Sequence, residues 1–200
     1  MKAYSNGLIV LLFFLLSLGR DEPELPDPNR GYAPNAYSAE DLTIVDSITG
    51  ATLKLGMTRE EIERLYEKDE EPTFPYENYE GLGVFFRDDV AASFRIAADD
   101  NASSRFKTAR GIGLGSGKKD VAERYGLQYA FDDELSGGST SLTYRLAETE
   151  DAMEALDEKA QLWNYDQEHL YAISFGFFDS KNEPIFIILI GDWKSIFQMS

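Results

Sequence analysis

A segment that occurs twice constrains the fold of this chain more than any other feature. Residues 53–66 read LKLGMTREEIERLY, and residues 112–125 read IGLGSGKKDVAERY. The aligned pairs are Gly56 with Gly115, Glu61 with Asp120, Ile62 with Val121 and Tyr66 with Tyr125. Each copy predicts a short apolar strand, a glycine turn and an amphipathic helix. A spacing of about sixty residues is too long for a solenoid, so we expect two halves of one small domain.

The strands expected after each copy extend the repeat. VFFR at 84–87 resembles LTYR at 142–145, at nearly the same offset from the helix. Short turns between strands predict antiparallel pairing, with the helices on one face. We therefore expect an α+β fold in which two pseudo-repeated halves, each a helix plus an antiparallel sheet, form a two-layer sandwich. The domain would cover residues 41–200, with halves at about 41–109 and 110–200.

The first expected helix follows a clear start signal. Thr58 is a candidate N-cap, and Glu61 stands three residues later, as in a capping box. The helix is expected to continue to about Lys68. Its apolar face comprises Ile62, Leu65 and Tyr66.

Other elements follow from periodicity and turn residues. A second helix is expected over 118–125, ended by Gly126, and a third over 149–162. The polar segment 98–109 predicts a loop. Strands are expected at 42–45, 51–55, 82–87, 90–96, 128–131, 142–146, 170–178 and 185–190. Residues 185–190 are apolar on both faces and therefore belong at the centre of a sheet.

The composition supports a domain with a substantial core and narrows the classes of partner. The 200 residues are 43% hydrophobic, with 36 acidic against 19 basic residues and a net charge of −17. This balance argues against non-specific nucleic-acid binding and against docking on anionic lipids. The simplest explanation of the negative charge is that it keeps the protein soluble. The functional alternative is that it attracts a basic partner or cations. No cysteine is present, which excludes disulfides and thiolate chemistry.

The N-terminus has the pattern of a secretory signal. Lys2 precedes an apolar run at 7–18. As a helix this run would span roughly 18 Å, short of the ~30 Å hydrocarbon core. Small residues stand three and one positions before Arg20, at Ser17 and Gly19, so we expect a signal peptide over 1–19, with an uncleaved anchor as the rival.

A spacer is expected to follow the signal. Residues 20–40 hold four of the seven prolines and predict an acidic, proline-rich linker. From the signal and the linker we expect the protein to be exported and to be extracellular or associated with the cell envelope.

The paired segments at 53–66 and 112–125, each followed by antiparallel strands, resemble the tandem-repeat exported proteins related to beta-lactamase inhibitory protein. The resemblance covers about residues 42–191. It implies the sandwich fold and a concave sheet face that holds a partner. The inhibitors usually carry disulfides, which this chain lacks, so inhibitory activity and contact residues do not carry over.

Several motifs that suggest chemistry fail on spacing. The glycine-rich run from Gly111 has Ile112 where a phosphate loop needs glycine, and Lys119 where it needs Ser or Thr. His169 is the only histidine, and no serine stands in a nucleophile context. We therefore predict no cofactor, no metal and no catalytic residue.

Carboxylates leave one enzymatic alternative open. A glycosidase-like acid pair is compatible with the composition. The tightest cluster, 132–134, does not fit a calcium loop because Thr143 stands where the bidentate glutamate is required. A hairpin turn is the simpler interpretation of that cluster.

The best candidate contact surface is the loop at 72–81. It holds Phe74, Tyr76 and Tyr79 among acids and prolines, and constrained aromatics make good interface anchors. Alternatively, Phe74 and one tyrosine fold back over the core. Trp163 and Tyr165 either extend the same surface or close the core.

These observations favour a non-enzymatic exported binding module. It would engage a protein partner with a basic surface by its open sheet face and aromatic-acidic loops. The alternatives are a carboxylate-based envelope hydrolase or glycan-binding protein, and a scaffold that acts by localisation. An enzyme needs a pocket with two facing carboxylates ~5–10 Å apart, whereas a binder needs an apolar patch.

Overall fold

The computed structural model describes residues 31–70, 73–98, 105–135, 138–178 and 184–197. The predicted signal peptide and residues 20–30 of the predicted linker lie outside these ranges. The helical elements are η1 (Ala39–Leu42), α1 (Arg59–Glu63), α2 (Lys118–Tyr125), η3 (Leu162–Asn164), η4 (Gln167–His169) and α3 (Trp193–Phe197). The strands are β1 (Thr43–Asp46), β2 (Thr52–Lys54), β3 (Glu77–Tyr79), β4 (Leu82–Arg87), β5 (Val90–Ala97), β6 (Phe106–Thr108), β7 (Ala130–Glu134), β8 (Thr140–Glu148), β9 (Met153–Leu156), β10 (Leu170–Phe177) and β11 (Ile185–Asp192).

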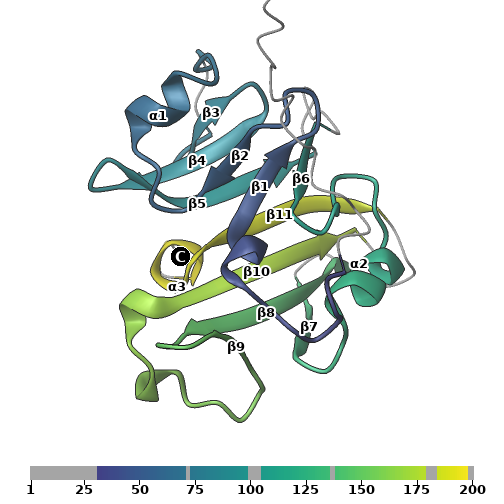
Figure 1. The fold of residues 1–200 in the computed structure, drawn as a ribbon. Coiled ribbons are helices and arrows are strands. Elements are labelled where there is room, and N and C mark those ends of the chain that lie inside the picture. Colours follow the sequence, from purple (N-terminus) through teal and green to yellow (C-terminus); the bar gives the residue numbers. More distant parts are fainter. Residues whose placement is uncertain (1–30, 71–72, 99–104, 136–137, 179–183, 198–200) are drawn as a thin grey trace, which may run out of the picture.

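Two antiparallel sheets make up most of the fold (Figure 1). The larger sheet has eight strands in the order β3-β4-β5-β11-β10-β8-β7, and β9 also pairs with β8. The smaller sheet has three strands in the order β2-β1-β6. The fold is therefore a β-rich α+β fold with few helices, and β11 lies centrally in the large sheet, as its apolar sequence predicts.

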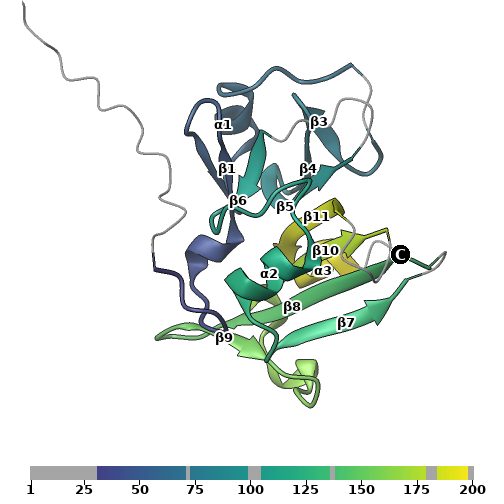
Figure 2. The same cartoon turned by 90° about the vertical axis from the view of Figure 1, so that its right-hand side faces the viewer.

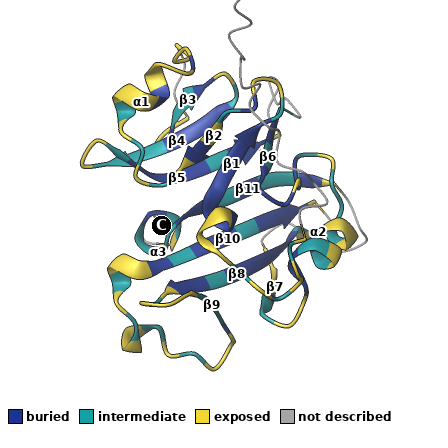
Figure 3. Cartoon of the chain, in the orientation of Figure 1, coloured by how far each residue is buried: buried dark blue, intermediate teal, exposed yellow. Residues whose placement is uncertain are grey.

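The core lies between the large sheet and a covering layer. The small sheet, α1 and α2 lie over one face of the large sheet (Figures 1 and 2). The burial colours in Figure 3 follow the same division, with buried strands inside and exposed helix faces and loops outside. The covering layer contributes Leu42, Ile44, Leu53, Ile62, Tyr66, Phe106, Ile112, Val121 and Tyr125 to the core cluster.

The start of α1 confirms the predicted cap, but its end does not match the prediction. The side-chain oxygen of Thr58 accepts from the backbone amide of Glu61, and the Glu61 carboxylate accepts from the Thr58 amide at 2.8 Å. The helix ends at Glu63 rather than near Lys68. Ile62 and Tyr66 are buried, but Leu65 is 46% exposed, because the chain leaves the helix before Leu65 can join their face.

The polar segment 98–109 was predicted to be a loop, and this prediction is wrong at its end. Residues 106–108 form β6 and pair with β1. Phe106 is fully buried and stacks edge-on against Tyr66. A single aromatic in a polar segment gives no periodic pattern, so the strand is set by the unpaired edge of β1 and not by local sequence.

The helix predicted over 149–162 is also wrong. The chain turns at Thr149, whose hydroxyl and amide both bond to the Ala152 carbonyl, and returns as β9. Since β7 begins at Ala130, opposite Tyr144, it leaves the edge of β8 from Arg145 onward with backbone groups that need partners. β9 supplies these partners. This backbone pairing outweighs the helical spacing of the apolar residues in 149–162.

A buried ion pair joins the chain before β1 to the segment between β6 and α2. Arg110 is 1% exposed and Asp41 is fully buried, and the guanidinium donates to both Asp41 oxygens. It also donates to the carbonyls of Ala33, Ala36 and Arg124. Contacts of the folded body therefore already begin in residues 33–36, inside the range predicted as linker.

Truncation of the two apolar side chains of α1 should have very different costs. Ile62→Ala is expected to lower the free energy of unfolding by about 2–5 kcal/mol, because it empties a fully buried site. Leu65→Ala should change it by about 0.5 kcal/mol or less. Urea unfolding of both variants checks this, and equal losses would contradict the observed end of the helix.

The Arg110–Asp41 pair gives a second prediction. Arg110→Met should cost about 3–5 kcal/mol, because Asp41 would keep a buried charge without a cation. The matched control is Arg64→Met, which breaks the exposed pair with Glu60 and should cost about 0.5 kcal/mol or less. The double variant Asp41→Leu/Arg110→Met should recover part of the loss in urea unfolding, and no recovery would show that lost packing dominates.

Candidate functional site

The three aromatic residues of the predicted contact loop have different environments. Phe74 is 94% exposed, whereas Tyr76 is 8% exposed and Tyr79 is fully buried. The Tyr76 hydroxyl lies 3.4 Å from the Ser93 hydroxyl on β5, and its ring contacts Phe85 edge-on. Phe74 therefore does not fold back over the core, and neither tyrosine ring is available to a partner in this fold.

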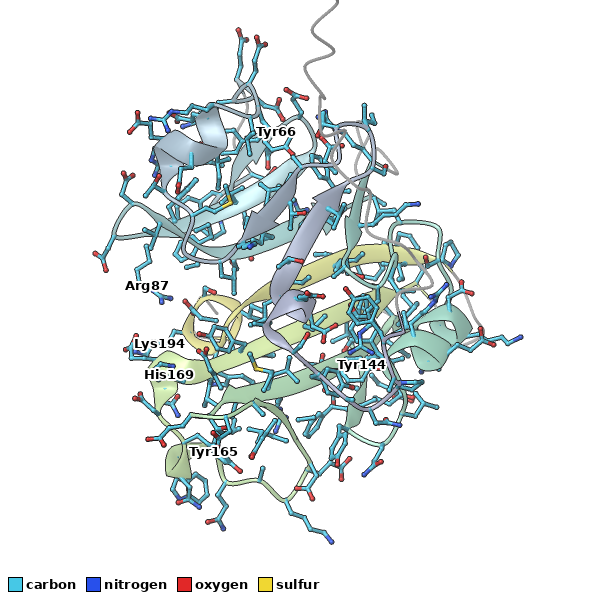
Figure 4. All side chains as sticks on the ribbon, in the orientation of Figure 1. Tyr66, Arg87, Tyr144, Tyr165, His169 and Lys194 are labelled. Atoms are coloured by element: carbon cyan, nitrogen blue, oxygen red, sulfur yellow. The ribbon has the colours of Figure 1, made fainter. Side chains whose placement is uncertain are left out.

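The two aromatics after β9 lie at the other end of the molecule. Trp163 in η3 is 76% exposed, and Tyr165 is half-buried against a small cluster on β8, β9 and β10. In Figure 4, Tyr165 lies far from Tyr66 in the covering layer beside α1. The described part of the predicted loop contains β3, at one end of the large sheet, and Tyr165 follows β9 at the other end. The predicted residues therefore do not form one surface.

The outer edge of β8 is covered by two short strands instead of one long strand. β7 pairs with residues 140–144 and β9 pairs with residues 145–148, both antiparallel to β8. They therefore run in the same direction, one after the other, and a break separates Leu156 at the end of β9 from Ala130 at the start of β7. Tyr129 and Asp157 flank this break.

Three adjoining hollows surround this break, and Tyr129 lines all of them. Their volumes are ≈ 340, 290 and 410 Å³. We call this surface the Tyr129 groove. Its walls comprise Asn35, Ala36 and Tyr37, the segments 127–131 and 153–160, and Tyr165.

The Tyr129 groove combines aromatic walls with an acidic rim. Tyr37, Tyr129, Phe131 and Tyr165 supply the aromatic rings. Glu154, Asp157 and Glu158 are exposed along it, against a single cation, Lys159. Of the residues predicted from sequence to bind a partner, Tyr165 alone lies in the groove. Tyr129 was missed because residues 127–130 contain no motif beyond a short strand pattern.

Buried ionisable groups elsewhere have structural partners. Burial alone raises the pKa of Asp46, but hydrogen bonds from Arg105, Thr49 and two backbone amides outweigh it and hold that pKa well below its usual value. Glu77 behaves in the same way: hydrogen bonds from Lys68 and Arg59 outweigh its burial and lower its pKa. A general acid needs a raised pKa, so these two carboxyls are unsuited to that role.

The remaining motifs have structural roles. The glycine-rich run turns at Gly115, with φ of +92°, and Lys118 at the start of α2 binds Asp132 on β7 at 2.7 Å. His169 is exposed, and its ring lies 3.2 Å from Glu148. Within the described ranges, no group of three or more metal-ligating side chains is placed to hold an ion. In the same ranges, no helix has the length and apolar run needed to cross a bilayer.

Asp46 predicts a loss of stability in acid. Because its folded-state pKa is lowered, the stabilisation is complete above the ordinary carboxyl pKa of 3.8 and decreases as the pH falls below it. The free energy of unfolding should drop on the order of 1–3 kcal/mol between pH 6 and pH 2 from this group. Asp46→Asn should flatten that part of the pH profile, while Asp151→Asn, an exposed control, should leave it unchanged.

Comparison of the chain with protein-family models, with curated proteins and with solved structures gives no match. The resemblance to the relatives of beta-lactamase inhibitory protein therefore rests on the repeated segments of the sequence alone.

Proposed function

We propose that this protein is an exported, non-enzymatic interaction module that binds a protein partner through the Tyr129 groove. The observation that carries the proposal is the break between β9 and β7, where three hollows meet at one tyrosine. Export rests on the signal pattern at 1–19.

The composition of the groove favours protein binding. Tyrosine combines a large apolar ring with a polar tip, and its burial by a partner contributes much of the affinity at interfaces. Met153 and Ala155 add apolar surface between the rings. The walls come from the N-terminal segment, from the α2–β7 connection and from β9, all held by the sheet and by the Arg110–Asp41 pair. Such a preformed surface binds with little loss of conformational entropy.

The charge of the groove favours a basic partner. Glu154, Asp157 and Glu158 lie on a molecule whose net charge is −17. An acidic groove on an acidic molecule accelerates encounter with a cationic surface, and added salt weakens this effect.

We also infer that the domain consists of two related halves, as the repeated segments suggest. In support, Gly56 and Gly115 both have positive φ, of +84° and +92°. The N-cap residue Thr58 forms an isolated β-bridge with Val90, the first residue of β5. The N-cap residue Gly117 forms the same kind of bridge with Pro184, the residue just before β11. β5 and β11 are neighbours at the centre of the sheet. In this arrangement β4 of the first half corresponds to β10 of the second. The sequence resemblance between residues 84–87 and residues 142–145 on β8 then does not mark equivalent strands.

The binding proposal is tested by capture from the secreted and envelope fractions of the source organism. The bait is the mature chain, compared with its Tyr129→Ala variant. Loss of the tyrosine should weaken capture of a specific partner about 30-fold, corresponding to about 2 kcal/mol. The matched control is Trp163→Ala, which removes a more exposed aromatic outside the groove and should retain the partner.

Two results would contradict the proposal. Equal capture by all three baits would place the contact outside the Tyr129 groove. Turnover of envelope glycans or peptides by the purified protein would favour the carboxylate-based hydrolase.

A further inference from the structure

Two arginines of the described ranges differ from those that pair with carboxylates. Arg59, Arg64, Arg87, Arg105 and Arg110 each form an ion pair with a carboxylate. Arg145 and Arg95, by contrast, have neither an ion pair nor a hydrogen bond within the described part of the chain. Two unneutralised cations on so acidic a molecule need an explanation.

Both unpaired arginines point away from the core. Along β8, Leu142, Tyr144 and Leu146 belong to the core cluster, so Thr143 and Arg145 face the opposite side of the sheet. Arg95 lies between two core residues of β5 and faces the same way. We call this side the outer face of the large sheet.

Aromatic rings fix the guanidinium of Arg145. Its central carbon lies 3.6 Å from the centre of the Phe131 ring and 5.5 Å from that of Trp193. Its Nε is buried and has no hydrogen-bond acceptor. Burial lowers the pKa of Arg145, and the fields of Asp133 and Glu158 oppose this without making a contact. The side chain is thus oriented and partly desolvated, but its charge is not neutralised.

Hydroxyl groups lie next to Arg145 on the same face. Thr143 is two residues away on β8, and its Oγ1 lies 2.9 Å from the Oγ of Ser174 on β10. One hydrogen joins the two oxygens, so the second hydroxyl hydrogen is available to another acceptor. A charged donor and a neutral donor are therefore adjacent.

We propose that Arg145 is the cationic anchor of a binding site for a carboxylate group on the outer face, assisted by the Thr143–Ser174 hydroxyl pair. A planar guanidinium held against aromatic rings offers its edge to a planar carboxylate, in the geometry of paired hydrogen bonds. Asp133 and Glu158 nearby repel any anion, and they oppose the higher charge of phosphate more strongly than the single charge of a carboxylate. The site goes beyond the proposed function: it shares Phe131 with a wall of the Tyr129 groove but does not require the partner of that groove.

The site is tested by titration of the full chain with sodium acetate at constant ionic strength. A Trp163→Phe background leaves Trp193, beside Arg145, as the only tryptophan, so its fluorescence reports the site. Acetate should give a saturable change that chloride does not give, and phosphate should bind more weakly. N-acetylglycine and its amide distinguish a peptide terminus from a free acid, and only forms with a carboxylate should bind.

Two arginine variants separate the site from general charge effects. Arg145→Gln should weaken acetate binding at least 10-fold, while Arg95→Gln, with the same change of charge on the same face, should leave it unchanged. Arg145→Lys keeps the charge without the planar fork and should bind with intermediate affinity. Tyr129→Ala should bind acetate like the wild type, so the two proposals can fail separately.

A non-saturable response, equal responses to acetate and chloride, or equal affinity in Arg145→Gln would overturn the assignment. If Arg145→Gln does not fold, the Ser174→Ala and Arg145→Lys variants decide the matter by their acetate-dependent shift in Tm. The shift should be smaller than that of the wild type in both, and unchanged shifts in both would refute the site.

Discussion

The fold depends on one buried cation. Arg110 follows β6, and it binds Asp41 in η1 together with carbonyls from residues 33–36 and from the end of α2. Tyr37 and Tyr125 pack against the same guanidinium. A charge buried to this extent is tolerated only if its donors are satisfied, so these segments must assemble together. The ion pair thereby joins the small sheet to α2 and also holds the segment that forms one wall of the Tyr129 groove.

Local signals predicted those parts of the fold that depend on neighbours in sequence. The capping box at Thr58, the glycine that ends α2 and the hairpin from Leu82 to Ala97 are all set within a few residues. The central position of β11 followed from its apolar faces. By contrast, β6 and β9 form because the edges of β1 and β8 need backbone hydrogen-bond partners. The sequences of β6 and β9 contain no periodic pattern from which this pairing could be predicted. Leu65 was misplaced for a related reason, since α1 ends early.

The candidate sites could be predicted far less well than the fold. The Tyr129 groove combines three segments that are distant in sequence, and it exists only because β7 and β9 divide one edge. In the sequence, Arg145 is an ordinary polar residue of an alternating strand. Its aromatic neighbours become apparent only in the fold, where the pairing of β7 with β8 places Phe131 beside it and α3 contributes Trp193. Aromatic residues in a proline-rich loop gave a stronger signal, yet two of the three are used for packing β3 and β4. Aromatic content alone does not distinguish packing from recognition.

The division of the outer edge has a consequence for solubility. An uninterrupted edge strand presents a row of free amides and carbonyls on which a foreign strand can grow. Here neither β7 nor β9 is long enough to offer such a row, and β7 carries Asp132, Asp133 and Glu134 in succession. Like charges on a second copy would repel one another at this border. The same interruption that forms the Tyr129 groove thus disfavours the pairing of a second copy along this edge of the sheet.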